Sequence, residues 1–174
     1  MPGQHFELKV VSRITIGTVG PPGQRIFLLQ ASEGSRMVTL KLEKEQTILL
    51  AQRLQELLDN LEEQYPRPGS KFDQPLSSDL MLQEPMEPEF VIGQMGIGYD
   101  ESQDKVVLIA QELLLDENQD PSTVRLWTTR AQMAALSRHA LEVTEQGRPI
   151  CPLCERPMDP DGHFCPRSNG HEEA

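Results

Sequence analysis

The residue types best suited to chemistry lie near the end of the chain, where all three cysteines and two of the four histidines fall. Cys151 and Cys154 are separated by two residues, and Cys165 follows a short distance further on. Two cysteines at this spacing can place both thiolates on one metal ion, and zinc accepts sulfur and imidazole nitrogen in a tetrahedral shell. In a reducing compartment such a cluster favours metal over a disulfide. The pattern therefore predicts a zinc ion held by these three cysteines and one histidine.

His163 and His171 are the two candidates for the fourth ligand. On an extended segment, His163 and Cys165 project their side chains to the same side, and Gly162 before them permits a tight turn. His171 lies in a polar tail that can also reach back to the metal. The spacing favours His163. Four protein ligands predict a closed structural site, without the open position that catalytic zinc keeps for water.

Composition narrows the classes of partner. The 174 residues carry a formal net charge of -11, and an acidic surface repels the phosphate backbone that supplies most non-specific affinity for nucleic acid. The N-terminus has no basic region followed by an apolar run, and no stretch reaches the roughly 18 apolar residues of a membrane-spanning helix. We therefore expect a cytoplasmic protein with a protein partner, and neither nucleic acid nor a membrane as its ligand.

The elements that precede the cysteines fall into two stretches. In the first, residues 6–19 alternate apolar and polar as a strand does, residues 25–31 form a short apolar run, and residues 37–42 alternate again. Apolar residues then recur at helical spacing over residues 43–64. Pro66 ends this helix, because the residue before a proline avoids helical torsions.

The second stretch repeats this order of elements. Strands are predicted at residues 89–99, 105–115 and 123–128. A helix follows, with Thr128 or Thr129 as its N-cap, and it ends at Gly147.

The two stretches can be aligned with each other. Residues 16–20 match residues 92–96 through a shared I-G-x-x-G sequence, and residues 25–29 match residues 105–109. Later matches keep one constant separation: Val38, Leu40, Gln46, Leu50 and Glu56 with Val124, Leu126, Gln132, Leu136 and Glu142. Apolar matches also arise between unrelated segments of the same secondary structure. The shared glycines and the shared element order favour an internal duplication over that alternative.

The expected fold class is α+β, with two βββα units forming an antiparallel sheet that two helices cover. The units span residues 1–64 and 89–147, and a small zinc knuckle occupies the tail at residues 148–174. Residues 65–88 are rich in proline and form a linker or a docking arm. Their apolar residues favour docking on the body.

Other features have structural explanations. The glycine-rich segment 17–23 precedes a strand, whereas a phosphate-binding loop precedes a helix, so the segment predicts a hairpin turn. Trp127 alternates out of phase with Leu126 and is expected on the opposite sheet face, covered by the arm. His5 and His139 have no nucleophile or carboxylate partner in sequence and are expected to be surface or packing residues.

Nearly the whole chain resembles a bacterial family known as domain of unknown function 3090. The likeness is carried by the tail CPLCERPMDPDGHFCPRSNG, the early segment TVGPPGQRIFLLQA, the EKEQ that opens the first helix and the GRPIC before the metal site. The resemblance implies a bacterial protein without an assigned activity. Family members share a G-H-x-C-P segment in the tail, which favours His163 over His171. Glu155 stands where a glycine often follows the first cysteine pair, and this difference removes no ligand.

Three functions are compatible with these residues. A non-enzymatic interaction or adaptor protein, with the zinc knuckle as a docking or stabilising element, needs no catalytic motif. The alternative is an enzyme with a site between the two repeats, which a polar cleft with converging titratable groups would reveal. Nucleic-acid binding through the zinc element is disfavoured, because its charges balance. The charged residues are Arg148, Arg156 and Arg167 against Glu155, Asp159 and Asp161. The sequence favours the interaction protein.

Overall fold

The computed structural model describes residues 3–21, 23–66, 80–116 and 118–146, together with two short strands in the tail. The elements are β1 (His5–Leu8), β2 (Arg13–Val19), β3 (Ile26–Glu33), β4 (Arg36–Leu42), α1 (Lys44–Gln64), β5 (Phe90–Asp100), β6 (Lys105–Glu112), β7 (Thr123–Thr128), α2 (Arg130–Gln146), β8 (His163–Phe164) and β9 (Glu172–Glu173). We call β2 to α1 the first unit and β5 to α2 the second unit.

Strands β1 to β7 form one mixed sheet in the order β1-β7-β6-β5-β4-β3-β2. Neighbours within a unit pair antiparallel, but β4 pairs with β5 in parallel, and so does β1 with β7. The prediction of a purely antiparallel sheet is therefore wrong. Because α1 carries the chain back along the sheet between β4 and β5, these two strands start from the same end, as parallel neighbours joined by a crossover do.

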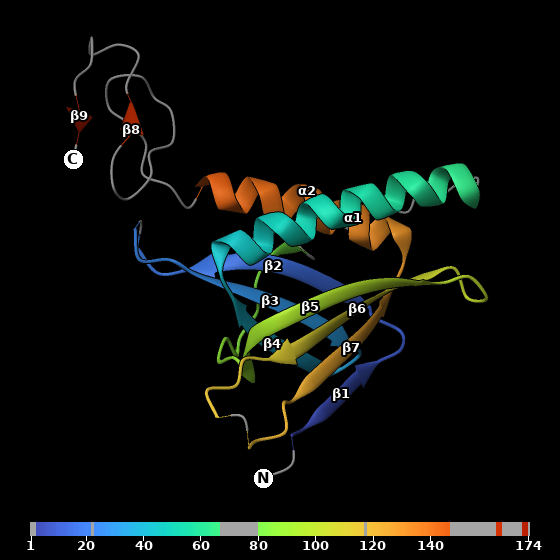
Figure 1. Cartoon of the computed structure of the whole chain (residues 1–174), viewed down its shortest axis with the longest axis horizontal. Coiled ribbons are helices and arrows are strands. Elements are labelled where there is room, and N and C mark those ends of the chain that lie inside the picture. The colour runs from blue at the N-terminus through green and yellow to red at the C-terminus, as the bar shows by residue number, and fades with distance from the viewer. Residues whose placement is uncertain are drawn as a thin grey trace.

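The core lies between one face of the sheet and the two helices. Figure 1 shows α1 and α2 side by side over this face. Alternate strand residues supply one layer, and residues at helical spacing supply the other. Fully buried members include Ile16, Leu29, Leu40, Leu108 and Leu126 from the strands and Leu54, Met133 and Leu136 from the helices. The α+β class is confirmed. Among the described residues, neither helix is long and apolar enough to cross a bilayer.

The start of α1 is fixed by Gln46. Its Oε1 accepts a hydrogen bond from the Glu43 backbone N–H at 2.7 Å, which satisfies a donor that the helix leaves unpaired. Its Nε2 donates to the carbonyl of Ile92 at 3.1 Å. One side chain therefore both begins α1 and ties it to β5.

The start of α2 has the same arrangement. The Oε1 of Gln132 accepts from the Thr129 backbone N–H at 2.9 Å, and its Nε2 donates to the carbonyl of Val11 at 2.8 Å. Thr129 Oγ1 accepts from the Gln132 N–H at 3.1 Å, so Thr129 is the N-cap. Gln132 thus does for the second unit what Gln46 does for the first.

The strand register allows the two units to be compared residue by residue. Ile16, Leu29 and Leu40 lie side by side in the first unit, and Ile97, Leu108 and Leu126 lie side by side in the second. If Leu40 is set against Leu126, as in the sequence alignment, the register sets Ile16 against Ile97, whereas the sequence alignment set Ile16 against Ile92. Leu29 likewise corresponds to Leu108, since a shift of one residue would move the side chain to the other face.

The sequence predicts one strand over residues 6–19, whereas the structure has two at opposite ends of the sheet order. Between them, the Val11 N–H donates to the Trp127 carbonyl at 3.2 Å and the Ser12 N–H donates to the Ser32 carbonyl at 2.7 Å. The chain therefore leaves β7 and joins β3 within residues 9–12. These residues connect the two ends of the sheet.

Candidate functional site

The predicted zinc ligands fall mostly outside the described residues, as Cys151, Cys154 and Cys165 do. His163 lies in β8, whose backbone pairs antiparallel with β9 and places His163 opposite Glu173. Within the described ranges, no group of three or more His, Cys, Asp or Glu side chains is arranged to hold a metal ion. The zinc site therefore stays a prediction from the sequence.

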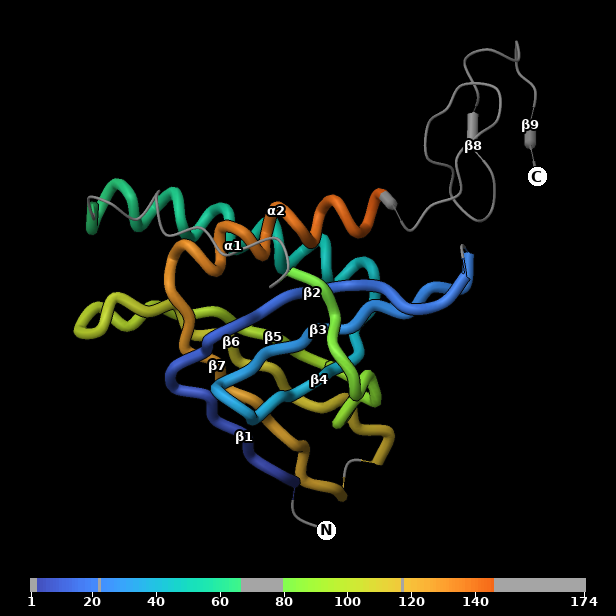
Figure 2. The backbone as a smooth tube through the Cα atoms, turned by 180° about the vertical axis from the view of Figure 1, so that it is seen from behind, coloured from blue at the N-terminus to red at the C-terminus, as the bar shows by residue number. Residues whose placement is uncertain are grey.

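Part of the proline-rich arm lies on the first unit. Residues 80–83 cross the sheet face opposite the core, and Figure 2 shows this segment in green running across the strands of the first unit. The Thr15 hydroxyl donates to the Leu80 carbonyl at 2.6 Å, and Arg13 Nη1 donates to the Met81 carbonyl at 3.0 Å. The arm is therefore held by its backbone.

Gln30 is the buried centre of this contact. Its Nε2 donates to the Gln83 carbonyl at 2.7 Å, and its Oε1 accepts from the Gln83 N–H at 2.9 Å. The same amide accepts from Arg13 Nη2 at 3.2 Å and donates to Thr39 Oγ1 at 3.2 Å. The side-chain amide of Gln30 thus makes the two hydrogen bonds to Gln83 that the backbone of a neighbouring strand would make. All of its polar atoms are satisfied, as buried polar groups require.

Leu82 lies directly over Gly17. A Cβ atom built on Gly17 would lie 2.6 Å from Leu82 Cγ, closer than carbon atoms pack. The missing side chain therefore forms the depression that seats Leu82. Glycine in a strand interior is typical of such close approaches.

The equivalent place in the second unit is uncovered within the described residues. Gly98 corresponds to Gly17, because each follows one of the equivalent residues Ile16 and Ile97. A Cβ atom on Gly98, or on Gly96 two residues earlier, would meet no atom within 4 Å. The second unit thus has a depression like the one that seats Leu82, but open.

Apolar side chains flank this depression. Val107 lies opposite Gly98 and next to Trp127, and Ile109 lies opposite Gly96. Ile109 is 37% exposed and Trp127 is partly exposed. We call Gly96, Gly98, Val107, Ile109 and Trp127 the open face.

The open face differs in chemistry from the face under the arm. Ile109 stands in the place of Gln30, and Gly96 in the place of Thr15. The groups that hydrogen-bond the arm backbone in the first unit are therefore replaced by apolar surface. Trp127 lies on the face opposite buried Leu126, as predicted. The contacts of arm residues 80–83 are with the first unit, so they do not supply the cover expected for Trp127.

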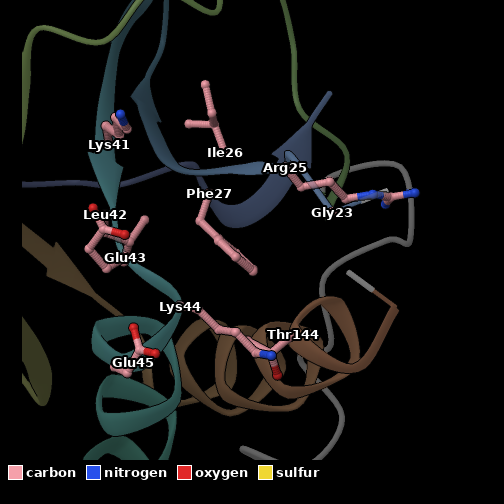
Figure 3. Close-up of a pocket in the computed structure, with 10 residues that line it drawn as sticks. All are labelled: Gly23, Arg25, Ile26, Phe27, Lys41, Leu42, Glu43, Lys44, Glu45 and Thr144. Carbon is pink, nitrogen blue, oxygen red and sulfur yellow. The ribbon is translucent and has the colours of Figure 1, made fainter. Parts of the chain in front are cut away.

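A cavity of about 340 Å³ lies beside the start of α1, near the end of α2 (Figure 3). Arg25, Lys41 and Lys44 bring three positive charges to its lining, and Glu43 and Glu45 bring two negative ones. Figure 3 shows the Arg25 guanidinium directed away from both lysines. The cations do not converge on one point, and the cavity therefore lacks the arrangement of an anion site.

A second cavity, of about 410 Å³, lies between α1 and β5. Arg53 is the charged residue of its lining, which is otherwise mostly apolar and includes Leu49 and Met95. Neither lining contains a histidine or a cysteine. The second cavity therefore does not gather a set of titratable groups of the kind that acid–base chemistry would use.

Arg130 at the start of α2 is the centre of a hydrogen-bonded network. Its Nε donates to Asp104 Oδ1 at 2.9 Å, its Nη2 donates to the Tyr99 hydroxyl at 3.1 Å, and that hydroxyl donates to Asp104 at 2.7 Å. The guanidinium also lies 5.5 Å from the centroid of the Tyr99 ring. Burial lowers the pKa of Arg130, but the hydrogen bonds with Tyr99 and Asp104 outweigh it, so the net direction is upward. Arg130 is a fixed cation with a structural role.

The protein is an α+β protein with a mixed sheet, and no described residue covers its open face. A family model described as "Protein of unknown function (DUF3090)" matches residues 6–165, and the chain belongs to this family. The resemblance seen in the sequence is thereby confirmed. Comparison with curated proteins and with solved structures gave no match.

Sequence reasoning missed the open face. The sequence alignment pairs Ile16 with Ile92 and so leaves Gly98 outside the repeat. The signal was nevertheless present, since Ile97 and Gly98 repeat the Ile16 and Gly17 pair. Only the strand register shows that both glycines lie on the face opposite the core.

Proposed function

We propose that this protein is a non-enzymatic interaction module that binds an extended apolar segment of a partner protein on the open face. The observation that carries the proposal is the contrast between two equivalent glycines. Leu82 covers Gly17, whereas no residue in the described part of the chain covers Gly98, which is flanked by apolar side chains. The first unit supplies an example, within this molecule, of how such a face takes an extended segment.

The chemistry of the open face favours a peptide over a small polar ligand. Trp127 offers a large amphipathic surface, and tryptophan is enriched among residues that dominate binding energy at interfaces. Arg125, exposed beside Ile109, offers a charge at the rim. Burial of apolar area contributes about 25 cal/mol per Å². A partner segment that buries one or two apolar side chains on the open face would therefore bind it reversibly.

We also propose that residues 148–174 bind one structural zinc ion through Cys151, Cys154, His163 and Cys165. The cysteine spacing supports it, and so does the two-residue interval between His163 and Cys165, which places both side chains on one side of an extended strand. The metal would supply most of the folding free energy of so short a segment.

We further propose that the two units arose by duplication. The similar roles of Gln46 and Gln132 support this, because each joins a helix start to a backbone carbonyl outside its own unit, Ile92 in β5 for Gln46 and Val11 just before β2 for Gln132. The Ile-Gly pairs at Ile16 and Ile97 support it as well. Similar secondary structure alone does not require either feature.

The interaction is tested by affinity capture from the native cell with the full chain and two variants. Ile109→Asp places a charge on the open face and is expected to abolish capture of the specific partner. Leu115→Asp is the control, because Leu115 is 97% exposed outside the open face. The captured proteins are quantified by mass spectrometry, and thermal unfolding checks that both variants fold. A partner retained equally by Ile109→Asp, or no specific partner at all, would contradict the proposal.

Metal analysis of the purified chain tests the zinc site. One zinc ion per chain is expected, and His163→Ala should lose it whereas His171→Ala should keep it. Mass spectrometry of the native protein counts the bound metal. The reverse pattern of the two histidine variants would exchange the fourth ligand, and a tail that is fully folded without metal would remove the site.

A further inference from the structure

We infer that the cavity between α1 and β5 is a second binding site, which takes a small carboxylic acid with an apolar chain and pairs its carboxylate with Arg53. This site is separate from the interaction proposed above, because the two lie on opposite sides of the sheet. Met95 and Ile97 line the cavity and pack against the core. Ile109 and Trp127 project from the other face of the sheet.

A β-bulge in β5 shapes the floor of the cavity. The register of β5 against β6 shifts between Ile92 and Gln94, which makes Gly93 an extra residue in the strand. The side chains that face the core are therefore Ile92 before the bulge and Met95 and Ile97 after it. Bulges redirect side chains in this way and are common next to active sites.

Contacts on both sides hold the bulge in place. A Cβ atom on Gly93 would lie 2.8 Å from Leu113 Cα, so glycine is needed for this close approach. The Leu113 N–H donates to the Val91 carbonyl at 2.7 Å. On the helix side, Gln46 Nε2 donates to the Ile92 carbonyl at 3.1 Å. The floor of the cavity is therefore fixed to α1 and to the strands around it, and the cavity is preformed, as sites for small molecules usually are.

Most of the cavity lining is apolar. Its volume of about 410 Å³ lies within the range of about 300–1,000 Å³ of small-molecule sites, which combine apolar walls with a few polar groups. Leu49 of α1 is 49% exposed and shares the cavity with Met95 and Ile97, which are partly buried. An apolar chain in the cavity would remove these three side chains from water, which favours its binding.

Arg53 supplies the charge of this site. It follows Leu49 by one helical turn, so the two lie on the same side of α1. Among the described residues, none with a negative charge lines the cavity, and none forms an ion pair or a hydrogen bond with Arg53. In the first cavity, by contrast, Glu43 and Glu45 accompany the cations. A guanidinium matches a carboxylate through two parallel hydrogen bonds, and one arginine in an apolar lining suits a single negative charge better than a phosphate.

NMR of the full chain tests the site with octanoate as the probe, read from isotope-labelled methionine methyl groups. The Met95 signal, assigned with Met95→Leu, is expected to shift and to saturate. The signal of Met81, which is 67% exposed on the arm, should stay in place. Octanol and octylammonium have the same chain without the negative charge and should bind about tenfold more weakly. A Met95 signal that does not shift with octanoate, or equal affinity for octanol, would overturn the inference.

Variants then locate the bound octanoate. Arg53→Gln should weaken octanoate binding about tenfold and leave octanol binding unchanged, whereas Arg36→Gln, at an exposed arginine that begins β4, should change neither. Leu49→Asp should abolish octanoate binding, and its control is Leu141→Asp, at a leucine that is 41% exposed on α2. Ile109→Asp should bind octanoate normally, which separates this site from the open face. Thermal unfolding checks that each variant folds. Full octanoate affinity in Arg53→Gln, or its loss in Ile109→Asp, would show that the cavity is not the site.

Discussion

Arg130 shows how one side chain joins three elements. It begins α2, bonds Asp104 and Tyr99 at the β5–β6 hairpin, and lies 3.4 Å from the carbonyl of Leu61 near the end of α1 through Nη1. Helix carbonyls in the last turn have no partner within the helix. The fixed fork of an arginine suits several acceptors at once.

Removing this side chain should therefore destabilise the fold. Arg130→Ala is expected to lower the free energy of unfolding by roughly 2 kcal/mol, because Asp104 loses one of its donors and the Tyr99 hydroxyl loses the guanidinium that donates to it. Urea denaturation measures the change. Arg53→Ala is the control, since Arg53 is exposed, and its effect should stay within about 0.5 kcal/mol. Equal effects of the two variants would show that the Arg130 network contributes little.

For single residues, the sequence predicts a function where that function depends on spacing along the chain. The interval between Cys151 and Cys154 indicates a metal before any fold is known. The role of Gly98 does not follow in the same way, because it depends on which residues lie across the sheet. Arg130 was missed for the same reason, as its partner Asp104 is distant in sequence.

Among the elements, the two helices are the clearest predictions. The expected helix at residues 43–64 is found as Lys44–Gln64, since helical apolar spacing and Pro66 fix both ends. The break between β1 and β2 was missed, because apolar and polar residues go on alternating roughly through it. The docking of residues 80–83 was harder to predict, because much of it depends on hydrogen bonds to their backbone groups. Such bonds leave no pattern in the side chains of the sequence.

The glutamines at the helix starts give a matched pair of predictions. Gln46→Met and Gln132→Met should each lower the free energy of unfolding by about 1–3 kcal/mol, because each leaves a backbone N–H and a carbonyl without their partner. Chemical denaturation measures both. Gln55→Met is the control, because Gln55 is exposed on α1 and bonds only Asp59, at 3.4 Å, among the described residues. A large effect in one unit alone would contradict the equivalence of the two helix starts.

At the scale of the whole molecule, the mixed sheet depends on the pairing of β1 with β7, two strands that are far apart in the sequence. Leu8, at the end of β1, is fully buried against the core. Leu8→Ala is expected to lower the free energy of unfolding by about 2–5 kcal/mol, as for other buried leucines. Val10→Ala, at a position that is 64% exposed, should change it by less than about 0.5 kcal/mol. Calorimetry compares the two, and a small effect of Leu8→Ala would mean that β1 is dispensable.

The order of strands could not be predicted. Alternation indicates that residues form strands, but it carries no information on their neighbours, and the element order βββα is compatible with several pairings. The parallel pairs β4–β5 and β1–β7 arise from the crossover of α1 and from the bend at residues 9–12, which are properties of the assembled sheet.

That bend has a consequence for how the chain is made. β1 leaves the ribosome first, but its partner β7 is among the last strands to appear, and the contact between His5 and Thr123 spans a sequence separation of 118 residues. Contacts this distant slow folding, because a long loop must close before they form. The first unit can pair its own strands early, while β1 waits without a neighbour. We therefore expect nascent chains that stop before residue 123 to remain incomplete and prone to association, and the sheet to form completely only after β7 has been synthesised.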